Sequence, residues 1–466
     1  MGHVDIGDSR SADNGAAGLG LLMMLSGGVW LGLMGSTTFN IMSLSIKSHG
    51  GGSGAGAFIL FGLVSMVRSG FHMAAGSSLL NARARSDFSK GPLYWTYVYI
   101  GTALAHTVLF WLLLKSKLHI KTSEALPIIC MLTAWPLTLL VATAVGPLGA
   151  LKDEIPEPTD RGIEQAGVLM AILGTIGTIF AVLILVIVFK IPKATSSAEG
   201  IIALLICASL VVRSIMHANA GFKTVQGGDL YDATSAIARY NRWGVGTAMG
   251  AAGGLFLMMV MNKFAGELFV MILTIGYLLF LWPYLVGRFV MDRCGDLNVY
   301  GDERAPSVRS PDMGLTALGW LLIALAVLGL AAALPAVLLH GPKTRLSSNA
   351  SPLFGMADFA NASGRSLWWS VAGSALQLWA GVELLGMRPG HKLAAWVYGV
   401  GASAITLYMA WPVLKMLDKS RSLMKFDSPM SFLAIYAQLA LALVIPVGTL
   451  LLVLRRNRRL PPARVV

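Results

Sequence analysis

The sequence predicts an all-α, polytopic integral membrane protein with about 12 transmembrane helices, arranged as two clear and one degenerate parallel four-helix repeats. Three observations predict this class. Of the 466 residues, 55% are hydrophobic and only 13% are charged, whereas ordinary soluble domains carry about 25% charged residues. Apolar runs of roughly 20 residues, the length that crosses a bilayer core, recur along the whole chain. Local sequence patterns also recur at a nearly constant spacing.

The apolar runs are separated by short connections, so we expect no large soluble domain. The acidic start "MGHVDIGDSRSADNG" lacks the basic region of a secretory signal, and the first run is therefore expected to remain as a helix. Taken in order, the predicted spans are 16–35, 56–79, 94–114, 125–148, 166–190, 200–221, 243–262, 267–288, 314–340, 367–386, 393–414 and 430–454.

An Arg-Ser-x-x-His pattern occurs twice inside apolar runs, in "VRSGFHMAAG" from Val67 and in "VRSIMHANAG" from Val212. The two copies are 145 residues apart, and three weaker matches have offsets of 149, 145 and 147 residues. Near-constant spacing of several matches indicates a duplication. It predicts one four-helix membrane repeat over 1–150 and a second over 151–300.

A third, divergent repeat is predicted over 301–466, where "GRSLWWSVAGSAL" places Arg365 in the frame of the two earlier arginines. Tryptophan stands there in place of histidine. Because each repeat holds an even number of spans, the copies are expected to be parallel and related by an axis along the membrane normal.

Arginines inside spans are the main functional signal. Arg68 and Arg213, with the adjacent Ser69 and Ser214, lie in apolar runs, and Glu383 is the main acidic residue within a span. An ionisable group in a membrane interior needs a counter-charge, and the guanidinium fork suits carboxylates and phosphates. We therefore predict a transporter or channel-like protein for an anionic solute or lipid, with these five residues at the substrate site.

A redox function is the alternative that the sequence leaves open. His72, His217 and His106 lie in spans, and facing histidines can hold haem iron. Twelve helices are similar in number to the main subunit of haem–copper oxidases, but the chain lacks an adjacent His-His pair in the seventh span. A haem-binding or non-catalytic scaffold subunit of a respiratory-type complex with an oxidase-like architecture remains a second hypothesis. No cofactor and no metal site are predicted outright.

Catalytic motifs such as His-Glu-x-x-His and Gly-x-Ser-x-Gly are absent, which argues against an enzyme of those classes. No nucleic-acid module is present. The excess of Lys and Arg on the terminal side predicts that both termini are cytoplasmic, in what we expect to be a bacterial inner membrane. Expected partners are the bilayer, other membrane subunits, and an anionic lipid at the tail residues Arg455, Arg456, Arg458 and Arg459.

Overall fold

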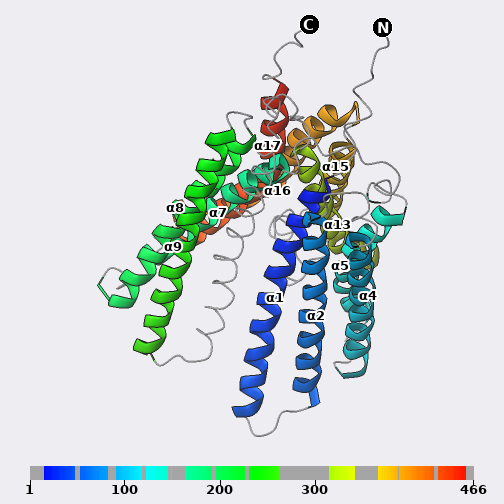
Figure 1. The fold of residues 1–466 in the computed structure, drawn as a ribbon, viewed down its shortest axis with the longest axis horizontal. Helices are drawn as coiled ribbons and strands as arrows, with labels where there is room; N and C mark the ends of the chain where they lie inside the picture. Colours follow the sequence, from blue (N-terminus) through cyan, green and yellow to red (C-terminus); the bar gives the residue numbers. More distant parts are fainter. Residues whose placement is uncertain are drawn as a thin grey trace.

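All regular elements in the described part of the chain are α-helices (Figure 1). The computed structural model describes residues 15–47, 53–81, 91–117, 122–144, 148, 163–190, 196–225, 230–262, 314–341, 366–386, 388–423 and 429–457. The helices are α1 (Ala16–Lys47), α2 (Ser53–Asn81), α4 (Pro92–Lys117), α5 (Thr122–Ala144), α7 (Ile163–Lys190), α8 (Ala198–Val225), α9 (Leu230–Asn262), α13 (Gly314–His340), α15 (Trp368–Leu385), α16 (His391–Leu423) and α17 (Pro429–Asn457).

The prediction of an all-helical chain with long apolar helices is confirmed. Eleven of the predicted apolar runs lie on these helices, and the run over 267–288 lies outside the described residues. The largest difference is α9, which begins at Leu230 rather than near Trp243. The polar stretch before Trp243 continues the helix, because it contains neither glycine nor proline to end it.

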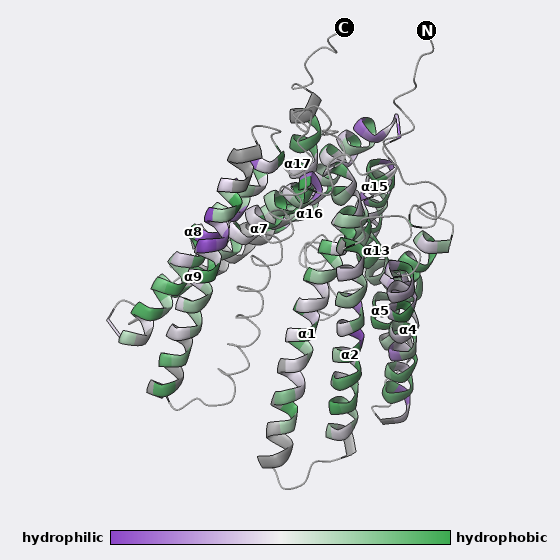
Figure 2. Cartoon of the chain, in the orientation of Figure 1, coloured by the Kyte–Doolittle hydropathy of each residue, from purple (hydrophilic) through white to green (hydrophobic). Residues whose placement is uncertain are grey.

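Seven of the described helices are long and apolar enough to cross a membrane, and shorter apolar segments lie in α5 and α17. Figure 2 shows hydrophobic and near-neutral residues along most of the helices, with fewer hydrophilic ones between them. Large apolar side chains such as Leu205, Met249 and Val141 are 66%, 68% and 62% exposed. Water would oppose such a surface, whereas lipid tails solvate it. The composition and the exposed surface are those of a multi-pass membrane protein.

Helices that follow one another in the chain pack side by side. The closest associations join α1 to α2, α7 to α8 and α13 to α15. The helices α2, α8 and α15 then pack against α4, α9 and α16, while α5 and α17 follow α4 and α16.

The helices α1, α7 and α13 also contact one another, and α5 and α17 reach across to α13 and α7. A buried hydrogen bond of 2.6 Å from the Gly18 amide to Gln165 Oε1 joins α1 to α7. These three helices therefore connect the outer groups of helices.

Each of the three closest helix pairs crosses at glycine. A methyl group placed on one glycine of the pair would stand 2.7–3.0 Å from the backbone carbonyl oxygen of the other. Small residues let membrane helices approach to backbone contact, so these positions set the distance between the helices. The pairs are Gly20–Gly76, Gly167–Gly221 and Gly319–Gly381.

Candidate functional site

The two arginines of the recurring pattern lie at the same level of their helices. Arg68 is the sixteenth residue of α2 and Arg213 is the sixteenth residue of α8. At 1.5 Å per residue, each lies about 22 Å from the start of its helix. Each also stands eight residues before the glycine that crosses the preceding helix. Both positions are central, several turns from either helix end.

Arg68 is half-buried and its guanidinium is held by groups from α4 and α5. Nη1 donates to Nδ1 of His106 at 3.3 Å, and Nη2 donates to the carbonyl oxygen of Leu132 at 3.3 Å. Its Cζ atom lies 6.0 Å from the centre of the Tyr99 ring, a cation–π distance. Arg68 therefore bridges three helices.

The contacts of His106 determine its protonation. Because a guanidinium can only donate, Nδ1 of His106 accepts and carries no proton. The ring is then neutral, with its proton on Nε2, which is 2.8 Å from Ser65 Oγ. Phe61 stacks on the same ring at 4.6 Å. All of these partners of Arg68 are consequently neutral.

His72 lies one turn beyond Arg68 and is buried. Its ring stacks flat on Tyr99, with centroids 4.3 Å apart and an interplanar angle of 11°. Nε1 of Trp135, in α5, donates to its Nε2 at 3.4 Å. An indole N–H only donates, so Nε2 of His72 is an acceptor and the ring is neutral.

The second copy repeats this arrangement between α8 and α9. His217 stacks on Tyr240 with centroids 4.6 Å apart and an interplanar angle of 7°. The guanidinium of Arg213 lies against the Tyr240 hydroxyl. In both copies, an Arg and a His one turn apart share one buried tyrosine of the next helix.

Sequence reasoning missed these two tyrosines. Tyr99 and Tyr240 are 141 residues apart, one helical turn short of the spacing that relates the arginines. Neither stands in a recurring motif, and each helix holds at least one further tyrosine, so no pattern distinguishes the two that face the histidines. Only the packing of the third helix on the second brings them to the histidines.

The serines of the pattern face a different neighbour. Ser69 is buried and its hydroxyl donates to the carbonyl oxygen of Ser65 at 2.9 Å, within its own helix. Ser214 Oγ lies 3.2 Å from the Cβ position of Gly177 in α7. The structure therefore places both serines in or beside the contact with the preceding helix.

Glu383, the predicted in-span acid, lies near the end of α15. Its carboxylate Oε1 is 3.6 Å from Nη1 of Arg388, which follows the helix and is 62% exposed. Its described ion pair is thus local to the α15–α16 connection. Of the tail arginines, Arg455 and Arg456 belong to the last turn of α17, whereas Arg458 and Arg459 lie outside the described residues.

The α13–α15 crossing identifies related positions on α15. In α2 and α8 the serine stands seven residues, and the histidine four residues, before the crossing glycine. The same spacing before Gly381 places Ser374 at the serine position and Gln377 at the histidine position. Both side chains are buried, with 7% of their surface exposed. The Cβ position of Gly329 in α13 lies 2.5 Å from Ser374 Oγ, the same kind of contact that Gly177 makes with Ser214.

A count from the same glycine can be continued into α16, and it differs from the frame predicted from the sequence. Tyr398 is 1% exposed and belongs to the same buried apolar cluster as Tyr240. Gly373 then occupies the arginine position. The sequence pattern placed Arg365 at the arginine position, which is eight residues, or about two helical turns, before Gly373. Arg365 itself lies outside the described residues.

Chemically, the arrangement offers cationic hydrogen-bond donors beside neutral imidazoles. The described residues contain no group of three or more His, Cys, Asp or Glu side chains positioned to hold a metal ion. Comparison with protein-family models, curated proteins and solved structures found no match.

Proposed function

We propose that the protein is a transporter or channel-like membrane protein for an anionic solute or lipid, with Arg68 and Arg213 at its site. One observation carries the proposal: the guanidinium of Arg68 lies at the middle of an apolar helix, and its described partners are a neutral imidazole, a carbonyl oxygen and a tyrosine ring. Arginine stays charged in proteins, and a charge at membrane depth requires a counter-charge. An anion from outside the chain would supply it.

The remaining donors of Arg68 suit such a ligand. Its side chain carries five N–H groups, the contacts to His106 and Leu132 use two of them, and the Tyr99 hydroxyl lies close enough to engage another. Those two contacts hold the guanidinium plane in place. A guanidinium that is already fixed in place loses less conformational entropy on binding a planar or tetrahedral anion than a mobile arginine side chain does.

Three parallel four-helix repeats, over 1–150, 151–300 and 301–466, are part of the proposal. Three glycine crossings in equivalent helix pairs support it, as do the mutual contacts of α1, α7 and α13. In this arrangement two repeats carry an Arg-His-Tyr group. The third would carry the neutral set Gly373, Gln377 and Tyr398, so only two repeats would hold an anion.

The haem alternative on His72, His217 and His106 gains less from these contacts. His106 uses both ring nitrogens in hydrogen bonds, and Nε2 of His72 receives the Trp135 indole. Iron ligation through these atoms would break existing bonds. A visible spectrum of the purified protein, oxidised and reduced, tests it directly: a Soret band that His72→Ala removes would favour haem over anion transport.

Flux measurements in proteoliposomes test the anion proposal. Radiolabelled sulfate, phosphate and lactate serve as probes for wild type, Arg68→Gln, Arg213→Gln and a control, Arg239→Gln. The control changes an exposed arginine whose hydrogen bonds, among the described residues, go to Ser235 of its own helix. Losing a charge-assisted hydrogen bond costs about 1.5–3 kcal/mol. We expect at least a tenfold loss of flux in the first two variants and none in the control.

Equal flux in all four proteins would refute the assignment of the two arginines. Absence of flux for every probe, in protein shown to be folded, would instead favour the scaffold hypothesis. The cytoplasmic location of both termini and the bacterial inner membrane also remain proposals, and labelling of cysteines introduced at each end of the chain would test the orientation.

A further inference from the structure

Arg68 supplies one fixed positive charge to its site, and its described partners supply none. Its guanidinium contacts Nδ1 of His106, the Leu132 carbonyl oxygen and the face of the Tyr99 ring. The imidazole is neutral, because its Nδ1 accepts a hydrogen bond from the guanidinium and carries no proton. Among the residues that the structure describes, no carboxylate lies within ion-pair distance of Arg68. The group therefore carries a single positive charge.

The polar groups next to Arg68 already have partners. Ser65 Oγ lies 2.8 Å from Nε2 of His106, and Ser69 donates to the carbonyl oxygen of Ser65 at 2.9 Å. Phe61 stacks on the His106 ring, with centroids 4.6 Å apart. A ligand at Arg68 would meet one cation, bonded polar groups and aromatic rings. These groups offer a partner to one anionic end of a ligand and not to a second.

The charge of a ligand decides the net charge of the occupied site. A monoanion would neutralise the guanidinium, whereas a dianion would leave one uncompensated negative charge. An uncompensated charge at membrane depth is costly. A carboxylate also presents two oxygens in one plane, which matches the paired donors of arginine. Charge and shape thus both favour a monocarboxylate.

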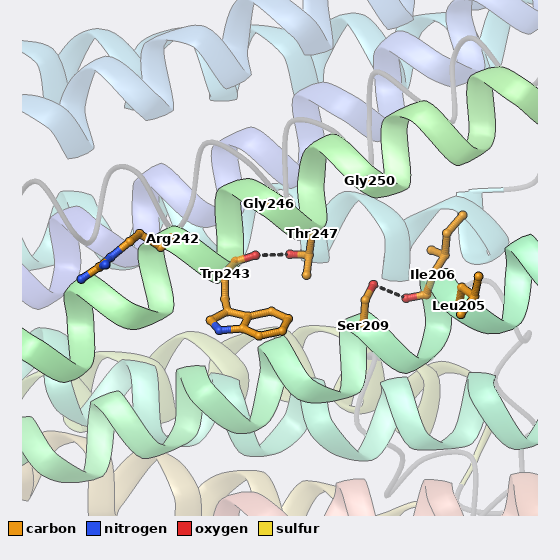
Figure 3. A pocket seen from close by; sticks show the side chains of 8 residues that line it. All are labelled: Leu205, Ile206, Ser209, Arg242, Trp243, Gly246, Thr247 and Gly250. Atoms are coloured by element: carbon orange, nitrogen blue, oxygen red, sulfur yellow. Dashed lines mark hydrogen bonds between the residues drawn. The ribbon is translucent and has the colours of Figure 1, made fainter.

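The second copy of the site differs, because a further cation lies beside it. A groove of about 480 Å³ lies between α8 and α9, and Figure 3 shows Arg242 at one end of it. Arg242 stands two residues after Tyr240, which Arg213 contacts. In the first copy, Gly101 stands two residues after Tyr99. The argument from a single charge therefore applies to the first copy, at Arg68.

We propose that the Arg68 site selects small monocarboxylates over dianions. This inference rests on the proposed anion transport and narrows it to one substrate class. The carboxylate pairs with the guanidinium of Arg68, and the uncharged remainder of the ligand meets the aromatic rings beside it. Because both arginines belong to the proposed site, selection at Arg68 limits the flux through the whole protein.

Flux of radiolabelled lactate and malonate into proteoliposomes at neutral pH tests the proposal. The two probes have the same number of carbon atoms, but lactate is a monoanion and malonate is a dianion. Flux into protein-free vesicles is subtracted. We expect wild type to move lactate at least about tenfold faster than malonate, because the malonate complex retains an uncompensated charge at membrane depth. Arg68→Gln should abolish the lactate flux.

Gly101→Arg adds a cation to the first copy at the position that Arg242 occupies in the second. Nothing lies within 4 Å of the Gly101 Cβ position, so a side chain can be placed there, and Gly101→Gln is the uncharged control. Coulomb attraction between unit charges extends over about 10 Å in a medium of low dielectric constant. We expect Gly101→Arg to lower the ratio of lactate flux to malonate flux by about threefold, and Gly101→Gln to leave it unchanged.

Malonate flux equal to lactate flux, with both lost in Arg68→Gln, would overturn this inference and leave the proposed function standing. So would an unchanged flux ratio in a Gly101→Arg protein that thermal unfolding shows to be folded. If that variant is unstable, the ratio in wild type decides. Lactate flux that does not depend on Arg68, or no flux of either probe, would overturn the proposed function and this inference together.

Discussion

Adding one methyl group at Gly76 should weaken the α1–α2 crossing measurably. A Cβ atom there would lie 2.8 Å from the Gly20 carbonyl oxygen and 2.9 Å from the Met24 amide nitrogen. Both contacts are backbone atoms, which cannot rotate away as a flexible side chain could. The helices must separate by several tenths of an ångström to restore an ordinary contact of about 3.5 Å. Overpacking of this kind costs about 1–3 kcal/mol.

Gly70 on the same helix provides a matched control, because nothing lies within 4 Å of its Cβ position. Alanine is favoured over glycine in a helix by about 1 kcal/mol, and this gain is common to both substitutions. The difference in unfolding free energy between Gly76→Ala and Gly70→Ala therefore isolates the clash. We expect Gly70→Ala to equal or exceed wild type and Gly76→Ala to fall below Gly70→Ala by about 1–3 kcal/mol.

The assay is thermal and denaturant unfolding in detergent, followed by tryptophan fluorescence. The same comparison applies at Gly221 and Gly381, whose Cβ positions also meet the backbone of the preceding helix. If Gly76→Ala were as stable as Gly70→Ala, the two helices would not meet at backbone distance, and the reasoning about glycine crossings would be refuted.

Three further predictions concern the polar contacts. Replacing Tyr240 by Leu should destabilise the α8–α9 pair by about 2 kcal/mol more than replacing it by Phe, because Phe keeps the stack on His217; equal unfolding midpoints would contradict a role for the ring. Ser65→Ala should cost about 0.5–1.5 kcal/mol in denaturant unfolding, since His106 loses one hydrogen bond and keeps its contact with the Phe61 backbone, and a neutral result would show that this bond contributes nothing. Glu383→Gln should change stability by less than about 1 kcal/mol, because Arg388 is largely exposed; a larger loss would show that Glu383 has a more important partner.

The candidate site was predictable in part. Arg68, His72, Arg213 and His217 stand in a repeated motif at helical spacing, so the sequence alone indicates that each pair shares one face of its helix. What each pair faces was not predictable. The serine one residue after the arginine belongs to another face, and the structure directs it toward the preceding helix.

The proposed third repeat is a second example of what the sequence does not show. Sequence similarity favoured an alignment of Arg365 with Arg68 and Arg213, because arginine and tryptophan are conspicuous in an apolar sequence. The contact between Gly319 and Gly381 favours a frame two turns further along, with Gln377 at the histidine position. Packing selects residues by size at a crossing, and a glycine in a chain with 52 glycines carries little information by itself.

The amino-acid sequence by itself determined that this protein is helical and apolar enough for a membrane, because a chain without charges over 20 residues must satisfy its backbone internally. It also determined which residue types recur. Only the tertiary structure decided which helices cross at glycine and which tyrosines stack on the histidines. The physical reason is that helix formation depends on local hydrogen bonds, whereas these contacts join residues dozens of positions apart and depend on how whole helix surfaces fit together.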